Sequence, residues 1–420
     1  MTRSRIPNRR VLAVIAAATV TTTLLSGCVS WFFPPKPETT STPTGEQVDA
    51  ALQPFYSQQL VWSSCGDGMQ CTTAQAPMNW EDPGQATIEL ALVRQPALGE
   101  KHGSLLVNPG GPGGSGYDFI LDSVDYATSQ RLQQNFDIVG FDPRGVGRSS
   151  AVSCGPASFI DEYNYGIIPG KYGSDDWLEK NREFGEKFGA ACLENTGPLL
   201  QYVDTISAAR DLDLLRATLG DTTLNYLGYS YGTFLGATYA DFYPEKTGHL
   251  VLDGAIDPAT TDFDVTATQA KGFESALRAY LEDCIGREGC PFQAGVESAM
   301  SQIGSLLESL QASPIESADG RQLGAGTMFI AIILPLYNQE NWPYLDQLFS
   351  EVMSGETETA FLLADSYNGR NSDGSYADNS TEAFVAINCL DYVGDYSTET
   401  LREQAAELAK IAPVFGPRMA

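Results

Sequence analysis

The stretch Gly228-Tyr229-Ser230-Tyr231-Gly232 decides how this 420-residue sequence is interpreted. The apolar run Thr223–Leu227 before it predicts a buried strand, and Phe234–Phe242 after it has a helical pattern. A G-x-S-x-G pattern between a strand and a helix is typical of a nucleophile elbow, a sharp turn that raises a serine hydroxyl above the sheet edge. Because larger side chains would collide in so tight a turn, both glycines are needed. Ser230 is therefore the candidate nucleophile.

A second, glycine-rich stretch follows the apolar run Ser104–Val107 and reads Asn108-Pro109-Gly110-Gly111-Pro112-Gly113-Gly114-Ser115-Gly116. Acyl transfer to a serine builds negative charge on a carbonyl oxygen, and loss of one N–H donor to that oxygen costs about 3–4 kcal/mol. A glycine-rich loop lets the backbone come close to the reacting atoms. We therefore expect an oxyanion hole formed by the amides of Gly111 and Tyr231, with Gly110 supporting the loop.

The same loop contains Gly111-x-Gly113-x-x-Gly116, which matches a dinucleotide-binding fingerprint. This pattern alone is weak evidence for a nicotinamide cofactor, and an exported protein has little access to one. A P-loop is excluded because no Gly-Lys-Ser/Thr follows the glycines. The expected chemistry needs no cofactor.

The N-terminus has the pattern of an export and lipid-attachment signal. Four arginines precede the apolar run Val11–Leu25, which is shorter than the roughly 20 residues that span a bilayer. Leu25-Ser26-Gly27-Cys28 then resembles the lipobox of bacterial lipoproteins. We predict a signal peptide over residues 1–27, lipid on Cys28 and a Pro/Thr-rich linker over 28–47. An ordinary secretory signal is the alternative, and Arg9-Arg10 leaves twin-arginine export open.

Export to an oxidising compartment favours disulfides among the eight cysteines. Short spacings suggest the pairs Cys65–Cys71 and Cys284–Cys290, with Cys154–Cys192 as a longer third pair. Cys389 is then left over. A metal site is not expected because the sequence has two histidines and no C-x-x-C pair.

Between residues 60 and 258, short apolar runs alternate with helical patterns, which predicts a doubly wound, mostly parallel sheet. The expected strands are Gln70–Met78, Thr87–Arg94, Ser104–Asn108, Phe136–Phe141, Thr223–Leu227 and Leu250–Leu252. From Asp262 onward, helical patterns dominate and predict a helical cap. The expected cap helices are Ala267–Ile285, Gly295–Leu310, Thr327–Tyr337, Trp342–Met353, Thr381–Leu390 and Thr398–Ile411. The predicted domains are an α/β core over 48–261 and a cap over 262–420.

Four motifs in this order resemble a known family. They are NPGGPGGSG from Asn108, Phe141-Asp142-Pro143-Arg144-Gly145-Val146-Gly147-Arg148-Ser149, the elbow with Thr233, and Leu252-Asp253-Gly254. The sequence is similar to the tripeptidyl-aminopeptidase group of α/β-hydrolases, relatives of prolyl aminopeptidases that bacteria secrete or anchor by lipid. The similarity covers about residues 45–420. It implies an α/β-hydrolase fold and a serine exopeptidase that removes short N-terminal peptides beneath a helical cap.

The resemblance extends to Ala386-Ile387-Asn388-Cys389-Leu390-Asp391 in the cap region. A peptide with a free N-terminus carries an amine that needs a carboxylate partner, and Asp391 is the candidate. A solvated surface acid is the alternative reading of Asp391. The motif Asp142-Pro143-Arg144-Gly145 is interpreted as a structural loop after its strand.

A serine hydrolase needs a histidine to take the serine proton and an acid to orient it, in the chain order Ser, acid, His for this fold. The only histidine after Ser230 is His249. His249 and His102 each precede a strand, whereas catalytic groups lie at the carboxyl ends of strands. We expect both to be surface residues. Asp253 and Asp257 are possible triad acids, although a role in turning the chain into the cap is favoured.

Relative to the family, the sequence is expected to lack the last strands and helix of the fold, with the triad histidine and acid beyond residue 420. The favoured function is an exported serine peptidase at the outer side of the cytoplasmic membrane. An esterase, or a non-catalytic peptide-binding relative if the chain truly ends at residue 420, are the alternatives. The expected partners are peptides and, through the lipid, the membrane. A net charge of −28 argues against nucleic acid.

Overall fold

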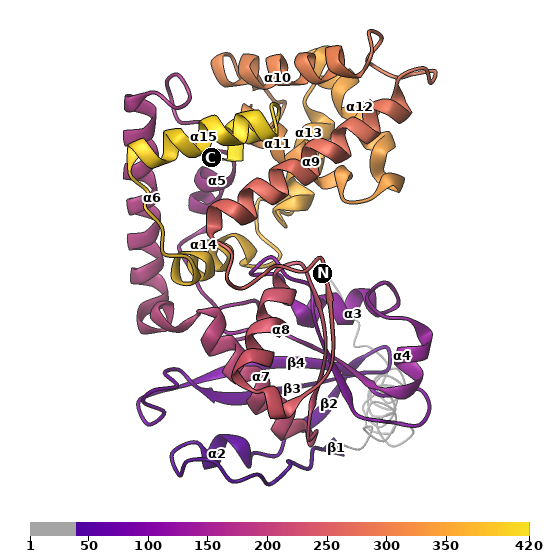
Figure 1. The fold of residues 1–420 in the computed structure, drawn as a ribbon, viewed down its shortest axis with the longest axis vertical. Coiled ribbons are helices and arrows are strands. Elements are labelled where there is room, and N and C mark those ends of the chain that lie inside the picture. The colour runs from indigo at the N-terminus through magenta and orange to yellow at the C-terminus, as the bar shows by residue number, and fades with distance from the viewer. Residues whose placement is uncertain (1–38, 420) are drawn as a thin grey trace, which may run out of the picture.

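The computed structural model describes residues 39–419 of the chain. A sheet with helices on both faces forms the lower part of the molecule, and a group of helices lies above it (Figure 1). The predicted signal segment, Cys28 and the first part of the predicted linker lie outside the described residues. Within residues 39–419, none of the helices combines the length and apolar character needed to cross a bilayer.

The sheet has eight strands in the order β1-β2-β3-β4-β6-β5-β7-β8. These are β1 (Thr39–Thr40), β2 (Val61–Gly66), β3 (Met69–Pro77), β4 (Thr87–Gln95), β5 (Ser104–Asn108), β6 (Asp137–Phe141), β7 (Leu224–Tyr229) and β8 (Thr247–Asp253). Strands β6, β5, β7 and β8 are parallel, and β1 to β4 pair antiparallel, with β4 also antiparallel to β6. The predicted α/β-hydrolase fold with a helical cap is confirmed. Strands β1 and β2 were not expected from the sequence.

Successive side chains of the central strand β5 point to opposite faces of the sheet and contribute to an apolar layer on each face. Leu105 and Val107 pack with Ile120 of α3 (Gly116–Ala127), while Leu106 packs into the layer that contains Leu215 of α7 (Thr205–Leu219). Short α4 (Gln130–Asn135) joins the α3 side, and α8 (Tyr231–Phe242) joins α7. Side chains two residues apart on a strand point to the same face, so β5 can be apolar throughout and still serve both layers.

Apolar residues recur at steps of three or four from Ile206 to Leu219, which predicts a helix that begins near Asp204 and ends at Gly220. Helix α7 has these ends. The side chain of Asp204 accepts a hydrogen bond from the Ser207 amide, which satisfies one of the unpaired N–H groups of the first turn. Gly220 follows the last helical residue with φ of +89°, a left-handed conformation that favours glycine. Almost the whole helix is buried, which fixes its first residue, Thr205, against the site described below.

The cap is built from two separate stretches of chain. Its main helices are α9 (Asp262–Cys284), α10 (Val296–Ala312), α11 (Ala325–Leu336), α12 (Trp342–Met353), α13 (Glu358–Tyr367), α14 (Ser380–Asp391), α15 (Thr398–Ile411) and α16 (Gly416–Met419). A small hairpin of β9 (Ile315–Glu316) and β10 (Gln322–Leu323) lies among them. Helix α13 was not expected from the sequence.

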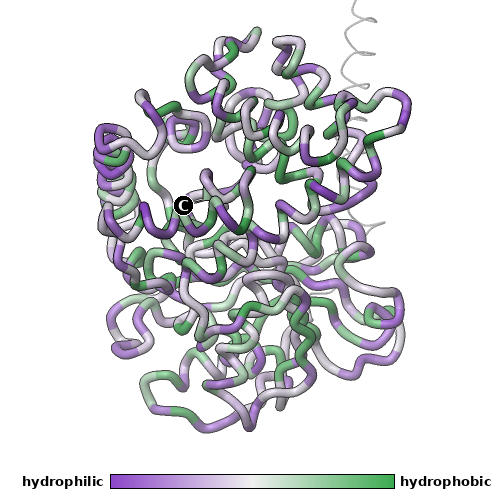
Figure 2. The backbone as a smooth tube through the Cα atoms, turned by 45° about the horizontal axis from the view of Figure 1, so that its top comes forward, coloured by the Kyte–Doolittle hydropathy of each residue, from purple (hydrophilic) through white to green (hydrophobic). Residues whose placement is uncertain are grey.

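The second stretch comprises α5 (Ala157–Tyr165) and α6 (Asp175–Thr196), which lie within the range predicted as core. Tyr165 packs in the apolar core of the cap, and its hydroxyl donates to Asp365 at 2.7 Å. Helix α6 runs from the sheet domain up to α15 (Figure 1), where Arg402 forms an ion pair with Asp175. Of its 22 residues only Phe188 and Cys192 are buried, which agrees with its hydrophilic colour in Figure 2.

The folded domain begins earlier than the predicted boundary at residue 48. Strand β1 pairs with β2, and Ser41 is buried with its hydroxyl accepting the Leu60 amide at 2.9 Å. Glu46 accepts hydrogen bonds from Arg216 at 2.8 Å and Lys246 at 3.0 Å. These contacts explain why residues 39–47 pack on the core despite a linker-like composition.

The structure contains the disulfides Cys65–Cys71, Cys154–Cys192 and Cys284–Cys290, as predicted, and Cys389 is free and exposed. The second disulfide joins the loop after β6 to α6, and the third closes the turn after α9. No group of three potential metal ligands is present in residues 39–419.

Buried Arg144 ties the loop after β6 to α7, in keeping with the structural role predicted for the Asp142–Gly145 motif. Its guanidinium donates to both carboxylate oxygens of Asp211 at 2.6 and 2.7 Å, and also to the carbonyls of Pro77, Met78 and Tyr202. Both side chains are almost completely buried. The pair is thus a fixed, fully hydrogen-bonded contact inside the core.

Replacing Arg144 by Ala should lower the free energy of unfolding by about 3–5 kcal/mol, because Asp211 would keep a buried carboxylate without its partner. Urea unfolding followed by circular dichroism measures this loss. Arg210→Ala is the control, since Arg210 pairs with Glu81, which is 78% exposed, and should cost less than about 1 kcal/mol. Equal losses in the two variants would contradict the structural role of Arg144.

Candidate active site

Ser230 lies in the sharp turn between β7 and α8, at the carboxyl edge of the parallel strands. Its φ of +51° and ψ of −123° are unusual for a residue with a side chain. The Ser230 amide donates to the carbonyl of Asp253 at 2.9 Å, which fixes the turn against the end of β8. Ser230 itself is exposed. The turn therefore presents a hydroxyl to solvent at the cost of backbone strain, a combination often found at functional sites.

Glycines allow the elbow and the glycine-rich loop to come together. A Cβ on Gly228 would lie 2.3 Å from the Gly232 carbonyl oxygen, and one on Gly232 would lie 2.7 Å from the Asn108 carbonyl oxygen. A Cβ on Gly110 would lie 2.5 Å from the Tyr229 carbonyl oxygen and 3.1 Å from the Ser230 Cβ. No residue with a side chain can occupy these three positions without displacing the backbone. The loop predicted to hold one oxyanion donor thus contacts the turn of the candidate nucleophile.

The amide of Tyr231 is the first of α8, where helix geometry provides no acceptor for it. It therefore points out of the helix beside Ser230, as an oxyanion donor must. In the glycine-rich loop, the Gly110 amide is used internally, because it donates to Asn108 Oδ1 at 2.9 Å. Gly111 is exposed and has φ of +115°. Its amide stays the predicted second donor.

Comparisons with known proteins agree with this geometry. A family model described as alpha/beta hydrolase fold matches residues 103–295. Serine protease Hip1 of Mycobacterium tuberculosis is 34% identical over 86% of this chain and 72% of Hip1. The chain belongs to the α/β-hydrolase family. Within it, this hydrolase also resembles carboxylesterase B of M. tuberculosis (33% identity, 90% of this chain, 74% of the relative) and the tripeptidyl aminopeptidase of Streptomyces lividans (28%, 93% and 75%).

Two buried side chains, neither singled out from the sequence, hold the elbow of this α/β-hydrolase in place. The hydroxyl of Tyr226 on β7 donates to the Gly232 carbonyl at 2.8 Å, and burial raises the pKa of Tyr226 far above its ordinary value. Asn108 lies between the two loops, with its carbonyl and side-chain oxygens against Gly232. A tyrosine that stays protonated is a permanent donor, so the contact holds at every pH at which the enzyme is folded.

Asp142 anchors the far end of the glycine-rich loop. Its carboxylate accepts hydrogen bonds from the Ser115 hydroxyl at 2.6 Å, the Tyr117 amide at 3.1 Å and the Arg148 amide at 2.7 Å. Burial nevertheless raises the pKa of Asp142 above its ordinary value, since desolvation outweighs these hydrogen bonds. The loop is therefore fixed at both ends, by Asn108 and by Asp142.

Asp391, the predicted ligand for a substrate amine, lies at the end of α14 and contacts the start of α7. One of its carboxylate oxygens accepts the Thr205 amide at 2.8 Å, and the other accepts the Thr205 hydroxyl at 2.6 Å. Burial raises the pKa of Asp391 to about 6. Both oxygens thus have a partner within the protein, and amine binding by Asp391 stays a prediction.

Both histidines of the sequence lie at the opposite edge of the sheet from Ser230. The His249 ring is exposed and its Nδ1 lies 3.1 Å from Asn225 Oδ1 near the start of β7, while Ser230 follows the end of that strand. His102 precedes β5, where its amide donates to the Asn135 carbonyl. This is the placement expected from the sequence. Among the described residues, no histidine is positioned to take the proton of Ser230.

The two candidate triad acids, Asp253 and Asp257, each accept a hydrogen bond from a backbone amide in the described structure. The Asp253 carbonyl accepts the Ser230 amide, and the Asp257 side chain accepts the Ala259 amide at 2.9 Å in the turn that leads toward α9. The Asp257 contact agrees with the turn role favoured from the sequence.

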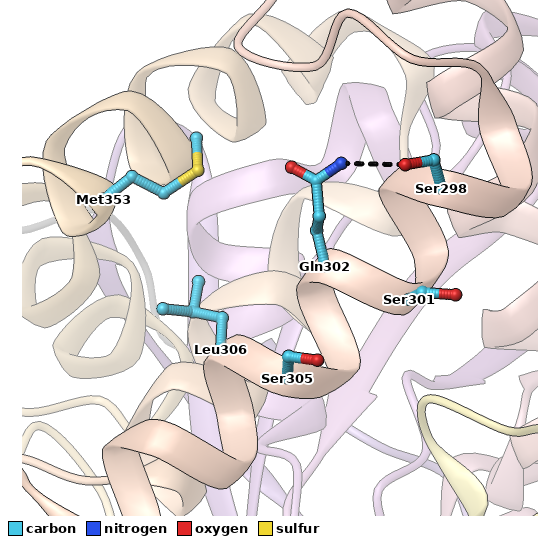
Figure 3. A pocket seen from close by; sticks show the side chains of 6 residues that line it. All are labelled: Ser298, Ser301, Gln302, Ser305, Leu306 and Met353. Carbon is cyan, nitrogen blue, oxygen red and sulfur yellow. Dashed lines mark hydrogen bonds between the residues drawn. The ribbon is translucent and has the colours of Figure 1, made fainter.

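Two surface hollows lie elsewhere on the molecule. One, in the cap, is formed by side chains of α10 together with Met353 at the end of α12 (Figure 3); it is lined by Ser298, Ser301, Gln302, Ser305, Leu306 and Met353. The other lies over β2, β3 and β4 beside Tyr117 and Arg148. Ser230 lines neither of these hollows, so we do not assign them to the substrate.

In the full-length gene product, replacing Gly110 by Ala should slow the reaction of Ser230 with a fluorophosphonate by at least about tenfold, because the new Cβ forces the loop and elbow apart. The rate is measured by labelling and intact mass. Gly173→Ala is the matched control, since Gly173 also has positive φ, +71°, but has no neighbour within 4 Å of an added Cβ. Its labelling rate should equal that of the unchanged protein. Labelling of the Gly110 variant at the unchanged rate would contradict close contact between loop and elbow.

Proposed function

We propose that this serine hydrolase is an exported peptidase that acts on peptides through an acyl-enzyme on Ser230. The observation that carries the proposal is the exposed Ser230 on a strained elbow, next to the first free amide of α8. The relatives named serine protease Hip1 and tripeptidyl aminopeptidase support peptide substrates. An exopeptidase that releases short N-terminal peptides is the finer form of the proposal.

In the proposed reaction, the Ser230 hydroxyl oxygen attacks the carbonyl carbon of the scissile peptide bond. The serine proton passes to a general base and then to the leaving amine, and the C–N bond breaks to give an ester on Ser230. Water then cleaves that ester by the reverse sequence. During both steps the negative charge on the carbonyl oxygen is stabilised by the amides of Tyr231 and Gly111.

We assign the general base and its acid partner to residues outside the 420 of this sequence. This assignment rests on the position of both histidines at the wrong edge of the sheet. It is also supported by the relatives, since the matched region covers 72–75% of the length of Hip1, carboxylesterase B and the S. lividans aminopeptidase.

Replacing Ser230 by Ala in the full-length gene product should reduce hydrolysis of a peptide anilide with a free N-terminus by about 10⁴-fold or more. It should also abolish labelling by a fluorophosphonate. Ser305→Ala is the control, because Ser305 is an exposed serine of the cap helix α10 and is not part of the elbow or the glycine-rich loop. If hydrolysis survives in the Ser230 variant, the proposed function fails. Preferential cleavage of simple carboxyl esters would favour the esterase reading, which the resemblance to carboxylesterase B supports.

We further propose that Cys28 carries lipid and holds the enzyme on the outer face of the cytoplasmic membrane. The three disulfides support export, because disulfides form in oxidising compartments. A Cys28→Ala variant should lose incorporation of labelled fatty acid and the membrane association that depends on it. Cys389→Ala is the matched control, since Cys389 is the free cysteine of the described residues. Equal fatty-acid labelling in the two variants would disprove the anchor.

A further inference from the structure

Helix α14 of the cap contacts the glycine-rich loop at one end and the start of α7 at the other. At its start, Gly113 of the glycine-rich loop fits so closely that an added Cβ would lie 2.7 Å from the Ser380 carbonyl oxygen and 3.0 Å from the Phe384 nitrogen. At its end, Asp391 binds Thr205 at the start of α7. The helix therefore connects the glycine-rich loop, which holds the predicted donor Gly111, to the start of α7, which contacts the side chain of the other predicted donor, Tyr231.

A short chain of hydrogen bonds continues from Asp391 to the residue that follows the nucleophile. The Thr205 hydroxyl contacts both Asp391 Oδ2 and the Tyr231 hydroxyl. Because a threonine hydroxyl has one proton, which it donates to the carboxylate, the Tyr231 hydroxyl must donate to Thr205. Burial raises the pKa of Tyr231 far above its ordinary value, so its proton is always present. The carboxylate thus sets the direction of the whole chain.

The side chain of Tyr231 is also held by aromatic contacts, which continue through Phe234 to the residue after α14. Its ring packs edge-on against Phe234 at a centroid distance of 6.0 Å, and Phe234 stacks on Tyr392, the residue after α14, at 6.2 Å. Tyr231 and Thr205 are both almost completely buried. A side chain fixed on two sides fixes its own backbone amide, and that amide is the predicted oxyanion donor.

Asn379, immediately before α14, locks the other end of the helix to the core. Its side chain accepts the Gly147 amide at 2.8 Å and donates to the carbonyls of Gly145 and Val152 at 2.8 and 2.7 Å. All three groups lie in the loop after β6. The core therefore sets the position of α14. A movement of this helix would displace the loop after β6 and the glycine-rich loop.

We propose that Asp391 is a positioning residue, which acts through Thr205 and Tyr231 to hold the oxyanion-hole amide in place, so that α14 couples the cap to catalysis. This inference rests on the proposed function. In this role Asp391 helps to stabilise the transition state through Tyr231. The sequence had suggested instead that Asp391 binds the substrate amine in the ground state. An amine ligand would change KM, whereas a positioning residue changes kcat.

The first test compares Asp391→Asn with Glu403→Gln, an exposed acid of α15 that serves as control. In the full-length gene product acting on a peptide anilide with a free N-terminus, the Asp391 variant should lose about tenfold in kcat with KM changed less than about twofold. An unchanged kcat would overturn the proposal. So would a raised KM with unchanged kcat, which would instead support amine binding.

A second pair of variants protects the test against misfolding. Thr205→Val removes the hydroxyl and should lower kcat as Asp391→Asn does, while Thr205→Ser keeps the hydroxyl and should restore it to within about twofold. Equal kcat values for the Val and Ser variants would overturn the proposal. Loss of activity in Ser230→Ala with full activity in the Asp391 and Thr205 variants would reject this inference alone, whereas full activity in Ser230→Ala would reject the proposed function.

The pH dependence separates positioning from a purely structural contact. The carboxylate is faced by Asp204 of α7, Tyr231 of α8 and Tyr392 beside α14, and its pKa of about 6 lies above the ordinary value because of burial. In the unchanged protein Asp391 is therefore protonated below pH 6. The difference in kcat between the unchanged protein and Asp391→Asn should be smaller there than at pH 8. A kcat gap of the same size at pH 5 and at pH 8 would contradict the proposal.

Discussion

The proposed active site depends on one constraint, the close approach of two backbone segments at the carboxyl ends of β5 and β7. In the register of these strands Asn108 pairs with Gly228, so the glycine-rich loop and the elbow leave the sheet side by side. Only glycine at positions 110, 228 and 232 leaves room for the approach. The strained conformation of Ser230 follows from it, because the chain must reverse from strand to helix within this space.

The cap is more than a cover over this edge of the sheet. It includes α5 and α6 from the middle of the chain, and it reaches the core through Asn379 and Asp391 at the two ends of α14. Few of these contacts are exposed. With the role proposed for Asp391, a cap fixed in this way transmits its position to the predicted oxyanion donors, which gives a physical reason for a helical insertion to matter in catalysis as well as in access.

Sequence patterns predicted the elements whose local chemistry is strong. The elbow, the six strands β3 to β8, α7 with its Asp204 and Gly220 ends, and the three disulfides were all expected. Local patterns could not show that residues 39–47 pack on the core, because that depends on distant partners such as Arg216 and Lys246. The same holds for α5 and α6, whose contacts with the cap involve residues about 200 positions later. Asp391 was found by resemblance, but its partner Thr205 could be found only in three dimensions.

The central claim is that a hydroxyl at residue 230 faces backbone amides arranged for an oxyanion. It is tested most directly by a crystal structure of the full-length protein after reaction with a peptidyl phosphonate. The account predicts a covalent bond from phosphorus to Ser230 Oγ, with a phosphonyl oxygen about 2.7–3.1 Å from the amides of Tyr231 and Gly111. An adduct on another residue, or a phosphonyl oxygen that points away from both amides, would contradict it.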